Sequence, residues 1–426
     1  MDKAISINPP AKPRSVSENV KYLIISCFSF LLILNAFLMN TPKEIIEGIR
    51  LIILSPSILL TDYIAVGNMG AAFFNSGLLM LLAILLAYFN KSHMNGTLIA
   101  AVFTVAGFAF FGKNIFNVVS IILGVYIYSL TQKEKFGKYI IVGFFGTSLS
   151  PVVSQLSFGF EEVSLLSIVI GNLAGIIAGI LLPPLAGHFV KFHQGFSLYN
   201  IGFTCGIIGT FFMSIIRALG EDHELISLVS NDNNLTLSIL FTILFISMIL
   251  IGCYYNGRSF KNYFHLFRHS GRLIADFVIM DGFGVTMINM GVLGLTMLAY
   301  VLILKGDLNG PTIGGILTVV GFGAFGKHPK NVIPIIGGVF LASLFWVYDV
   351  NSTSVIIAAL FSTTLAPIAG KFGAIIGIIA GFLHLTLVMN IGDLHGGMNL
   401  YNNGFSGGIV AATLVPIIEA FRKDED

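Results

Sequence analysis

The stretch that decides the fold is TVAGFAFFGKNIFNV at residues 104–118, because it recurs as TVVGFGAFGKHPKNV at residues 318–332. The same offset of 214 residues relates Asp62 to Asp276, and it relates several Gly and Asn positions upstream of the two copies. Duplication on this scale predicts a chain built from two structurally similar halves. In an apolar chain, such halves are typical of transporters and channels.

A second duplicated signature lies downstream of the first in each half. HQGFSLYNIGFTCG at residues 193–206 corresponds to HGGMNLYNNGFSGG at residues 395–408, with an offset of 202 residues. Each copy holds a His, a Tyr-Asn pair and several glycines within apolar surroundings. The two signatures therefore supply matched sets of candidate functional residues, one set from each half.

The composition predicts a polytopic α-helical membrane protein. Of the 426 residues, 55% are hydrophobic and 10% are charged, and the mean hydropathy is +0.89. Soluble proteins carry about 25% charged residues. Uncharged runs long enough to span the hydrocarbon core recur along the chain, and the short alternating segments of a β-barrel do not. The formal net charge of +2 argues against a nucleic-acid-binding role. The three cysteines, Cys27, Cys205 and Cys253, lie in apolar segments and are expected to be packing residues.

The apolar segments divide the chain into two sets of seven. The first set comprises 21–40, 63–89, 97–112, 117–130, 139–156, 167–190 and 195–219, and the second comprises 235–255, 277–304, 311–326, 331–348, 354–370, 372–391 and 395–419. We expect half-helices or re-entrant segments around 97–112, 195–212, 311–326 and 395–411, because these are short for a full span. The stretch 42–60 is expected to lie in the membrane interface. The predicted regions are a polar cytoplasmic tail (1–19), repeat 1 (20–220), an acidic extracytoplasmic link (221–234), repeat 2 (235–420) and a polar C-terminal tail (421–426).

The distribution of Lys and Arg predicts the orientation of the two halves. The N-terminal tail and the loops 131–138 and 256–272 are basic, so they are expected on the cytoplasmic side. The link 221–234 carries acidic residues and no Lys or Arg, so it is expected outside. An odd number of segments per half gives the same result. The sequence therefore predicts inverted repeats, related by an axis in the membrane plane.

The first signature places a lysine near the end of a short apolar segment in each half. Lys113 and Lys327 are candidates for attracting an anion or a polarised carbonyl into a pathway. The alternative is that each side chain reaches the lipid headgroups. Phenylalanines of the same signatures either constrict a pore or pack in the core; they are Phe108, Phe111, Phe322 and Phe325.

The second signature offers hydrogen-bonding groups. Asn200 and Asn402 need partners in an apolar environment, and either a solute or a neighbouring helix can supply them. Tyr199 and Tyr401 are candidates for the rims of aromatic slots beside these amides. His193 and His395 are interpreted as caps, with gating or proton relay as the alternative. Asp62 and Asp276 open the second segment of each half, where Asp is a natural N-cap.

The second signature resembles a stretch of the urea transporters, in which a Tyr-Asn segment runs into a helix of small residues. The matching residues are Tyr199-Asn200 and Tyr401-Asn402. Over its whole length the chain is similar to an uncharacterised bacterial integral membrane family (domain of unknown function 1576) that carries the Phe-Gly-Lys and Tyr-Asn-x-Gly-Phe patterns. The urea-transporter resemblance implies inverted halves, a central pore in each protomer, aromatic slots and a trimer. Lys113 and Lys327 depart from that family, so a small anion or another solute stays open beside urea.

These observations favour a channel or facilitator for a small polar solute in the bacterial inner membrane. The alternatives are an ion- or proton-coupled secondary transporter and, from other classes, a membrane scaffold or sensor or an intramembrane enzyme. The patterns of an intramembrane metalloprotease and of a Walker-type nucleotide loop do not occur. We therefore expect no enzymatic activity, cofactor or metal. The expected partners are the solute, membrane lipid and other copies of the chain.

Overall fold

In the part of the chain that the structure describes, the regular elements are all helices. The computed structural model describes residues 15–58, 60–159, 163–222, 227–345 and 348–421. Within these ranges, ten helices are long and apolar enough to cross a membrane, and four further apolar helices are shorter. The prediction of an all-α polytopic membrane protein is therefore confirmed. Most of the two predicted polar tails, at 1–14 and 422–426, lies outside the described residues, as do residues 223–226 of the acidic link.

Each half contains the same succession of apolar helices. In the first half these are α1 (Glu18–Met39), α4 (Met69–Phe89), α5 (Gly96–Phe108), α6 (Ile115–Thr131), α7 (Ile140–Gly146), α8 (Ser150–Phe158), α9 (Leu165–Phe189) and α10 (Asn200–Ala218). In the second half they are α11 (Asn234–Tyr255), α13 (Phe283–Ile303), α14 (Gly310–Phe322), α15 (Pro329–Phe345), α16 (Thr353–Ser362), α17 (Ala366–Phe372), α18 (Ala374–Ile391) and α19 (Asn402–Phe421). Shorter α2 (Pro42–Leu54), α3 (Tyr63–Val66) and α12 (Phe277–Met280) lie between them.

The short lengths of α5 and α14 have local causes in the sequence. Asn95 caps α5 by accepting from the Leu98 N–H, and Asn309 caps α14 in the same way. Both helices end shortly before a glycine with positive φ, Gly112 at 106° and Gly326 at 91°. Only glycine adopts this conformation without steric cost. The chain therefore breaks inside each first signature, and α6 or α15 begins just after the break.

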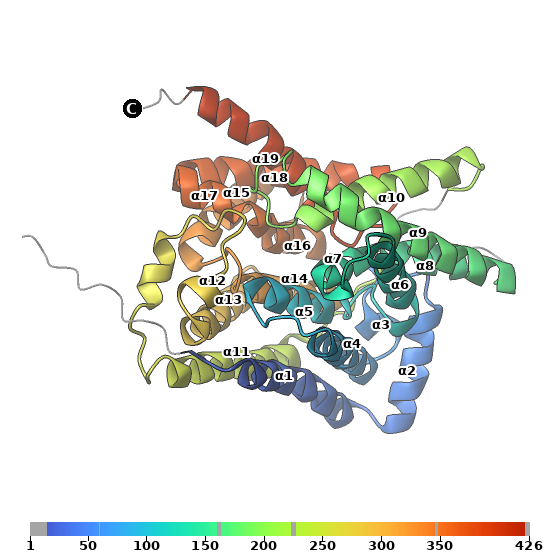
Figure 1. The fold of residues 1–426 in the computed structure, drawn as a ribbon, viewed down its shortest axis with the longest axis horizontal. Helices are drawn as coiled ribbons and strands as arrows, with labels where there is room; N and C mark the ends of the chain where they lie inside the picture. The colour runs from blue at the N-terminus through green and yellow to red at the C-terminus, as the bar shows by residue number, and fades with distance from the viewer. Residues whose placement is uncertain (1–14, 59, 160–162, 223–226, 346–347, 422–426) are drawn as a thin grey trace, which may run out of the picture.

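Helices α5 and α14 form the centre of the molecule (Figure 1). They are antiparallel, because Gly96 at the start of α5 lies against Ala324, whereas Gly310 at the start of α14 lies against Phe110. Their backbones meet closely at Gly107 and Gly314, where an added Cβ on either residue would lie 2.6 Å from the carbonyl oxygen of the other. Small residues permit this close approach between helices.

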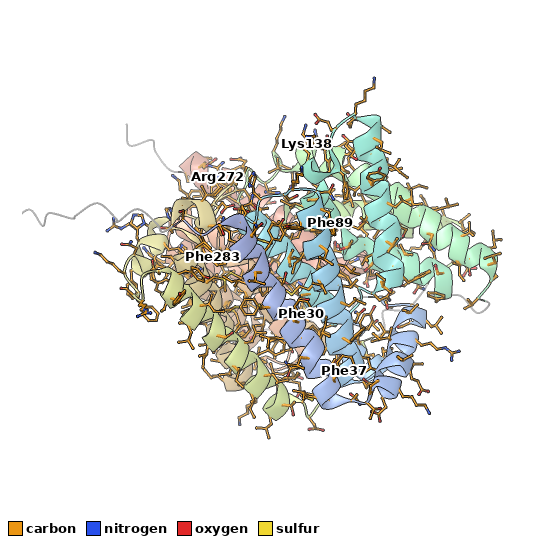
Figure 2. All side chains as sticks on the ribbon, turned by 60° about the horizontal axis from the view of Figure 1, so that its bottom comes forward. Phe30, Phe37, Phe89, Lys138, Arg272 and Phe283 are labelled. Carbon is orange, nitrogen blue, oxygen red and sulfur yellow. The ribbon has the colours of Figure 1, made fainter. Side chains whose placement is uncertain are left out.

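The outer helices present apolar side chains to the surroundings. Figure 2 shows α1 and α11 side by side on one face, with Phe30 and Phe37 along α1 and Phe89 at the end of α4. These three rings are 56%, 48% and 74% exposed. Exposed aromatic and aliphatic side chains on long helices fit a lipid-facing surface. The same view places Lys138 and Arg272, from the two basic loops, at the end of the molecule opposite Phe37.

One expectation about individual segments needs correction, and two other apolar segments have an internal feature. We expected short segments around 195–212 and 395–411, but α10 has 19 residues and α19 has 20, which is long enough to cross a membrane. The segments 139–156 and 354–370 are not continuous α-helices, since 3-10 turns interrupt them at Thr147–Leu149 and Thr363–Leu365. Hydrophobicity alone does not reveal either feature. Within the stretch 42–60, Pro42–Leu54 form α2, and the interfacial position of this stretch stays a prediction.

Candidate functional site

The two chain breaks are held by the same contacts in both halves. Asn75 Nδ2 donates to the carbonyls of Ala109 (2.7 Å) and Lys113 (2.8 Å). Asn289 Nδ2 donates to the carbonyls of Gly323 (2.7 Å) and Lys327 (2.8 Å). One buried amide therefore satisfies two carbonyls that the interrupted helix leaves free. The break is an ordered part of each half.

The two lysines of these breaks point into the protein interior. Both side chains are fully buried, so the alternative in which they reach the lipid headgroups does not fit. Lys327 Nζ donates to the Tyr199 hydroxyl and to Thr363 Oγ1 (2.6 Å). Lys113 Nζ contacts the Phe144 carbonyl at 3.4 Å. Among the described residues, no ion pair links either lysine to a carboxylate.

The two tyrosines of the second signatures meet between the breaks. The ring centroids of Tyr199 and Tyr401 are 4.8 Å apart, and both side chains are buried. Tyr199 lies edge-to-face with Phe322 at 4.8 Å, and Tyr401 lies edge-to-face with Phe108 at 4.5 Å. Each Tyr therefore packs on the Phe of the opposite half. Phe111 and Phe325 extend this aromatic cluster through Phe108 and Phe322.

The His and Asn residues of the second signatures bond to each other. His193 Nε2 and Asn200 Oδ1 are 3.0 Å apart, and His395 Nε2 and Asn402 Oδ1 are 2.9 Å apart. The Asn200 amide also donates to the Ala186 carbonyl at 3.0 Å, and Asn402 donates to Val388 at 3.2 Å. The amides thus join the end of one helix to the start of the next. Each Asn NH₂ group has a second N–H that this bond does not use.

Two small pockets lie beside the equivalent amides Asn200 and Asn402, and the first of them is also lined by the two tyrosines. The first, of about 140 Å³, is lined by residues that include Thr97, Ile141, Tyr199, Asn200, Leu273 and Tyr401. The second, of about 180 Å³, is lined by residues that include Leu60, Ile357, Asp393, Asn402 and Asn403. Asn200 and Asn402 are equivalent in the second signature, so each half contributes the same amide to one pocket.

Asp62 and Asp276 cap their own helices, as predicted. Asp62 Oδ1 accepts from the Ile64 N–H, and Asp276 Oδ1 accepts from Ile279. Each carboxylate also caps the central helix of the opposite half: Asp62 accepts from Gly310 at 3.1 Å, and Asp276 accepts from Gly96 at 2.9 Å. No sequence pattern indicates this exchange, which ties the two halves together at both ends of the α5–α14 pair.

Several polar residues around the centre were not anticipated from the sequence. In the 3-10 turn of the second half, the Thr363 hydroxyl accepts a hydrogen bond from Lys327. The hydroxyl of the next residue, Thr364, accepts from the Tyr199 N–H at 2.9 Å. Thr147 occupies the corresponding turn of the first half. The pattern Thr-Ser/Thr-Leu-x-Pro, at residues 147–151 and 363–367, was a usable signal, because it is duplicated inside apolar segments. His384, buried and bonded to Asn403 at 2.9 Å, carried no such signal.

Comparison with known proteins identifies the family. No curated protein and no solved structure matches the chain significantly, so the resemblance to urea transporters stays a prediction. A family model described as "Protein of unknown function (DUF1576)" matches residues 41–218 and 255–420. These two ranges cover most of the chain and contain both copies of both signatures. The chain therefore belongs to this family of polytopic membrane proteins.

Proposed function

We propose that the chain is a channel or facilitator that carries a small polar solute along the interface of two inverted halves. The single observation that supports this most is the pair of pockets lined by the equivalent amides Asn200 and Asn402, the first of which reaches Tyr199 and Tyr401 beside the buried Lys327. A pore between duplicated halves needs polar groups near its midpoint and a route from each end. In the proposed pathway, the packed Tyr199–Tyr401 pair is the closure that has to open for a solute to pass.

The contacts within each half support the inverted arrangement. Glu18, at the start of α1, accepts from the Met94 N–H. Two residues after Met94, the Gly96 N–H donates to Asp276, which follows the C-terminal end of α11 in the chain. Asn234, at the start of α11, bonds to the Gly306 carbonyl, on the side where Gly310 meets Asp62. The start of α1 and the end of α11 therefore share one end of the molecule, although these helices are equivalent in the two halves.

Cysteine labelling tests the inversion. Gly137 packs against Asn90 at the end where α1 begins, whereas Thr353 bonds to Asn309 at the other end. We expect Lys135→Cys and Asn351→Cys, both exposed positions, to react with an impermeant thiol reagent from opposite sides of the membrane. The background needs Cys27, Cys205 and Cys253 replaced. Reaction of both positions from one side refutes the inverted arrangement, and the reactive side of Lys135→Cys also tests the proposed cytoplasmic N-terminus.

The chemistry of the centre narrows the class of solute. Lysine amines, tyrosine and threonine hydroxyls and amide N–H groups all donate hydrogen bonds. No carboxylate pairs with the lysines among the described residues, so a solute that accepts hydrogen bonds fits best. This description covers small carboxylate anions and neutral solutes with a carbonyl, such as urea and short amides.

Uptake into proteoliposomes tests the proposal with a panel of urea, short amides, formate and acetate. We expect saturable or protein-dependent flux of at least one of them in the wild type. Lys327→Met and Lys113→Met should reduce that flux strongly, whereas Lys371→Met, which changes an exposed lysine, should leave it unchanged. Normal flux through the correctly folded Lys113 and Lys327 variants refutes the proposed pathway. Absence of flux for the whole panel favours the scaffold or sensor alternative.

The asparagines need a separate variant series, because they also have structural partners. Asn200→Leu and Asn402→Leu should each lower flux, and the double variant should nearly abolish it. Asn390→Leu is the matched control, since the Asn390 side chain is exposed and bonds only to its own helix at Thr386. Loss of folding without loss of flux per folded molecule would mean that the amides only join helices.

A proton-coupled carrier is the second candidate, favoured by the buried histidines. His193, His384 and His395 each bond to an Asn amide oxygen near the pockets. An imidazole bonded to an amide can exchange a proton at its other nitrogen. Uptake that collapses when the proton gradient is dissipated supports coupling. Uptake that follows only the solute gradient supports the channel. A trimer, implied by the urea-transporter resemblance, is tested by cross-linking in the membrane.

A further inference from the structure

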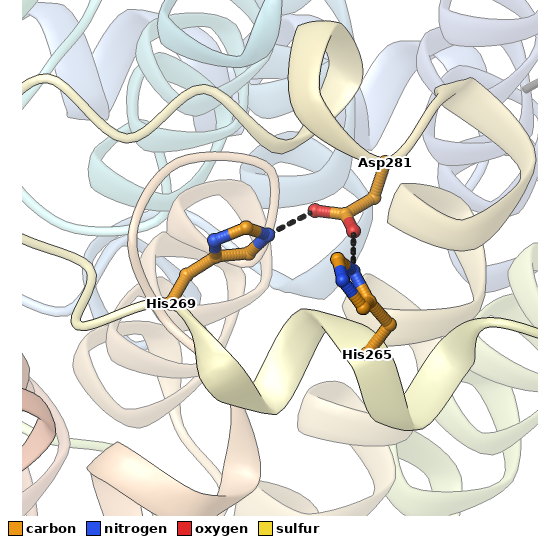
Figure 3. A group of neighbouring side chains, drawn as sticks. All are labelled: His265, His269 and Asp281. Atoms are coloured by element: carbon orange, nitrogen blue, oxygen red, sulfur yellow. Dashed lines mark hydrogen bonds and ion pairs between the residues drawn. The ribbon is translucent and has the colours of Figure 1, made fainter. Parts of the chain in front are cut away.

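A cluster of three side chains stands apart from the central site, at the basic end of the molecule. His265 and His269 come from the histidine loop, the segment between α11 and α12 that contains the 3-10 helix Tyr263–Arg268, and Asp281 lies between α12 and α13 (Figure 3). His265 Nδ1 is 3.1 Å from Asp281 Oδ1, and His269 Nε2 is 2.8 Å from Asp281 Oδ2. One nitrogen or oxygen from each residue lies within 4.8 Å of the others.

We propose that His265, His269 and Asp281 form a binding site for a divalent transition metal of the zinc class. Two imidazoles and one carboxylate are a ligand set that such ions prefer, and a water completes a four-coordinate site. Ligand atoms about 2.0–2.2 Å from a tetrahedral ion lie roughly 3.4 Å from one another. The two histidine–carboxylate separations of 2.8 and 3.1 Å are slightly shorter than this value, and all the ligand atoms lie within 4.8 Å of one another, so small side-chain movements would bring them to it.

The burial of the three side chains fits an ion that arrives from solvent. The Asp281 side chain is 3% exposed, whereas His269 and His265 are 19% and 33% exposed. The carboxylate is thus fixed inside, and the imidazoles at the surface can move to admit an ion. The two histidines are the only hydrogen-bond partners found for the Asp281 carboxylate among the described residues. A cation bound by all three would compensate this buried negative charge.

The duplication gives an independent reason to regard the cluster as an added feature. The position equivalent to Asp281 in the first half is Gly67, and the first half has amphipathic α2 where the second half has the histidine loop. The shared fold is therefore complete without these three residues.

The cluster is linked to the second chain break. His328, which follows Lys327, bonds through Nε2 to the His269 carbonyl at 2.9 Å. Asn331 Nδ2, at the start of α15, donates to the Gly326 carbonyl at 2.9 Å and contacts the Ser270 carbonyl at 3.4 Å. A bound ion would hold the histidine loop against α12 and α13, and through these bonds it would brace the break. Metal binding does not depend on the proposed transport function.

Zinc titration of the purified full-length chain tests the site. The protein is prepared in detergent without a polyhistidine tag, and Zn²⁺ is titrated in competition with a chromogenic chelator. We expect one site per chain, and we expect His265→Gln, His269→Gln and Asp281→Asn each to weaken it at least about tenfold. His188→Gln, an exposed histidine outside the cluster, should bind as the wild type does.

Thermal unfolding with and without Zn²⁺ gives a second measurement for any variant that folds poorly. Zinc should raise the unfolding temperature of the wild type and of His188→Gln, because a ligand that binds only the folded chain stabilises it. It should not raise that of the cluster variants. Wild-type affinity in all three cluster variants, or no stoichiometric Zn²⁺ binding to the wild type, overturns the proposal. Binding of Mg²⁺ or Ca²⁺ in place of Zn²⁺ also overturns it, because these ions prefer oxygen ligands.

Discussion

Replacement of the exchanged capping aspartates measures how strongly the two halves are held together. The Asp62 carboxylate accepts four hydrogen bonds, from the N–H groups of Ile64, Gly310 and Ser230 and from the Ser230 hydroxyl. The Asp276 carboxylate accepts two, from Ile279 and Gly96. Four donors around one carboxylate fit its ionised form, which accepts at both oxygens.

The number of donors left without a partner sets the expected magnitude. A buried donor that loses its acceptor costs about 1–3 kcal/mol, and an exposed or half-exposed donor recovers most of this from water. Gly310 is buried, and Ile64 and Ser230 are half-buried. We therefore expect Asp62→Ala to lower the free energy of unfolding by about 3–4 kcal/mol. For Asp276→Ala only Gly96 is a buried donor, so about 2 kcal/mol is expected.

Equilibrium unfolding in mixed detergent micelles, followed by far-ultraviolet circular dichroism, measures both losses. The two caps lie at opposite ends of the 13-residue helix α5, about 20 Å apart. The double variant should therefore lose the sum of the single losses, within roughly 0.5 kcal/mol. A loss below about 1 kcal/mol for Asp62→Ala, or a larger loss for Asp276→Ala than for Asp62→Ala, refutes the reasoning from the hydrogen bonds.

Three further predictions use the same unfolding measurement. Gly107→Ala should lower the free energy of unfolding by about 1–3 kcal/mol, because its Cβ would meet the backbone of α14 at 2.6 Å. Gly187→Ala, with nothing within 4 Å of the new Cβ, should leave the free energy of unfolding unchanged. Equal losses for the two variants would contradict the tight contact. Asn289→Ala should cost about 2–4 kcal/mol, since it leaves two buried carbonyls without a donor; an unchanged midpoint would mean that water replaces the amide. Tyr199→Phe, which removes a hydroxyl bonded to a buried lysine, should cost about 1–3 kcal/mol. It should exceed Tyr401→Phe, which removes a 3.3 Å bond between two hydroxyls; the reverse order would show that the two halves differ in another way.

The sequence predicted those elements whose limits are set by local chemistry. Helices α5 and α14 are short because Asn95 and Asn309 cap their starts and because Gly112 and Gly326 permit the turns that follow their ends. All of these signals lie within a few residues of the helix that they limit. The long apolar helices could also be predicted from the sequence, because hydrophobicity and length alone determine which segments suit a membrane.

The contacts between distant segments could not be predicted in this way. Nothing local to Asp62 indicates that it caps a helix beginning at Gly310, 248 residues away. The hydroxyl of Thr363 reaches Lys327 only because a 3-10 turn interrupts an apolar run, and hydropathy does not register such a turn. The His265–His269–Asp281 cluster also could not be predicted locally, because its ligands come from two segments, the histidine loop and the junction of α12 and α13.

The two halves share a framework but differ at the centre. The amides of Asn75 and Asn289 hold both breaks with nearly identical distances, so the backbones that carry Lys113 and Lys327 are equivalent. Yet Lys327 donates to the hydroxyls of a tyrosine and a threonine, whereas the hydrogen bond of Lys113 goes to the Phe144 carbonyl and its amine lies over the Phe108 ring. Because the framework is the same, this difference comes from the side chains and from the turns that face them. Under the proposed inverted arrangement, a matched pair of lysines in unequal environments is expected in one conformation of a protein whose halves exchange their arrangements. The comparison of Lys113→Met with Lys327→Met therefore also tests whether the two lysines act at different steps of passage. Unequal effects of the two substitutions on flux would support different steps.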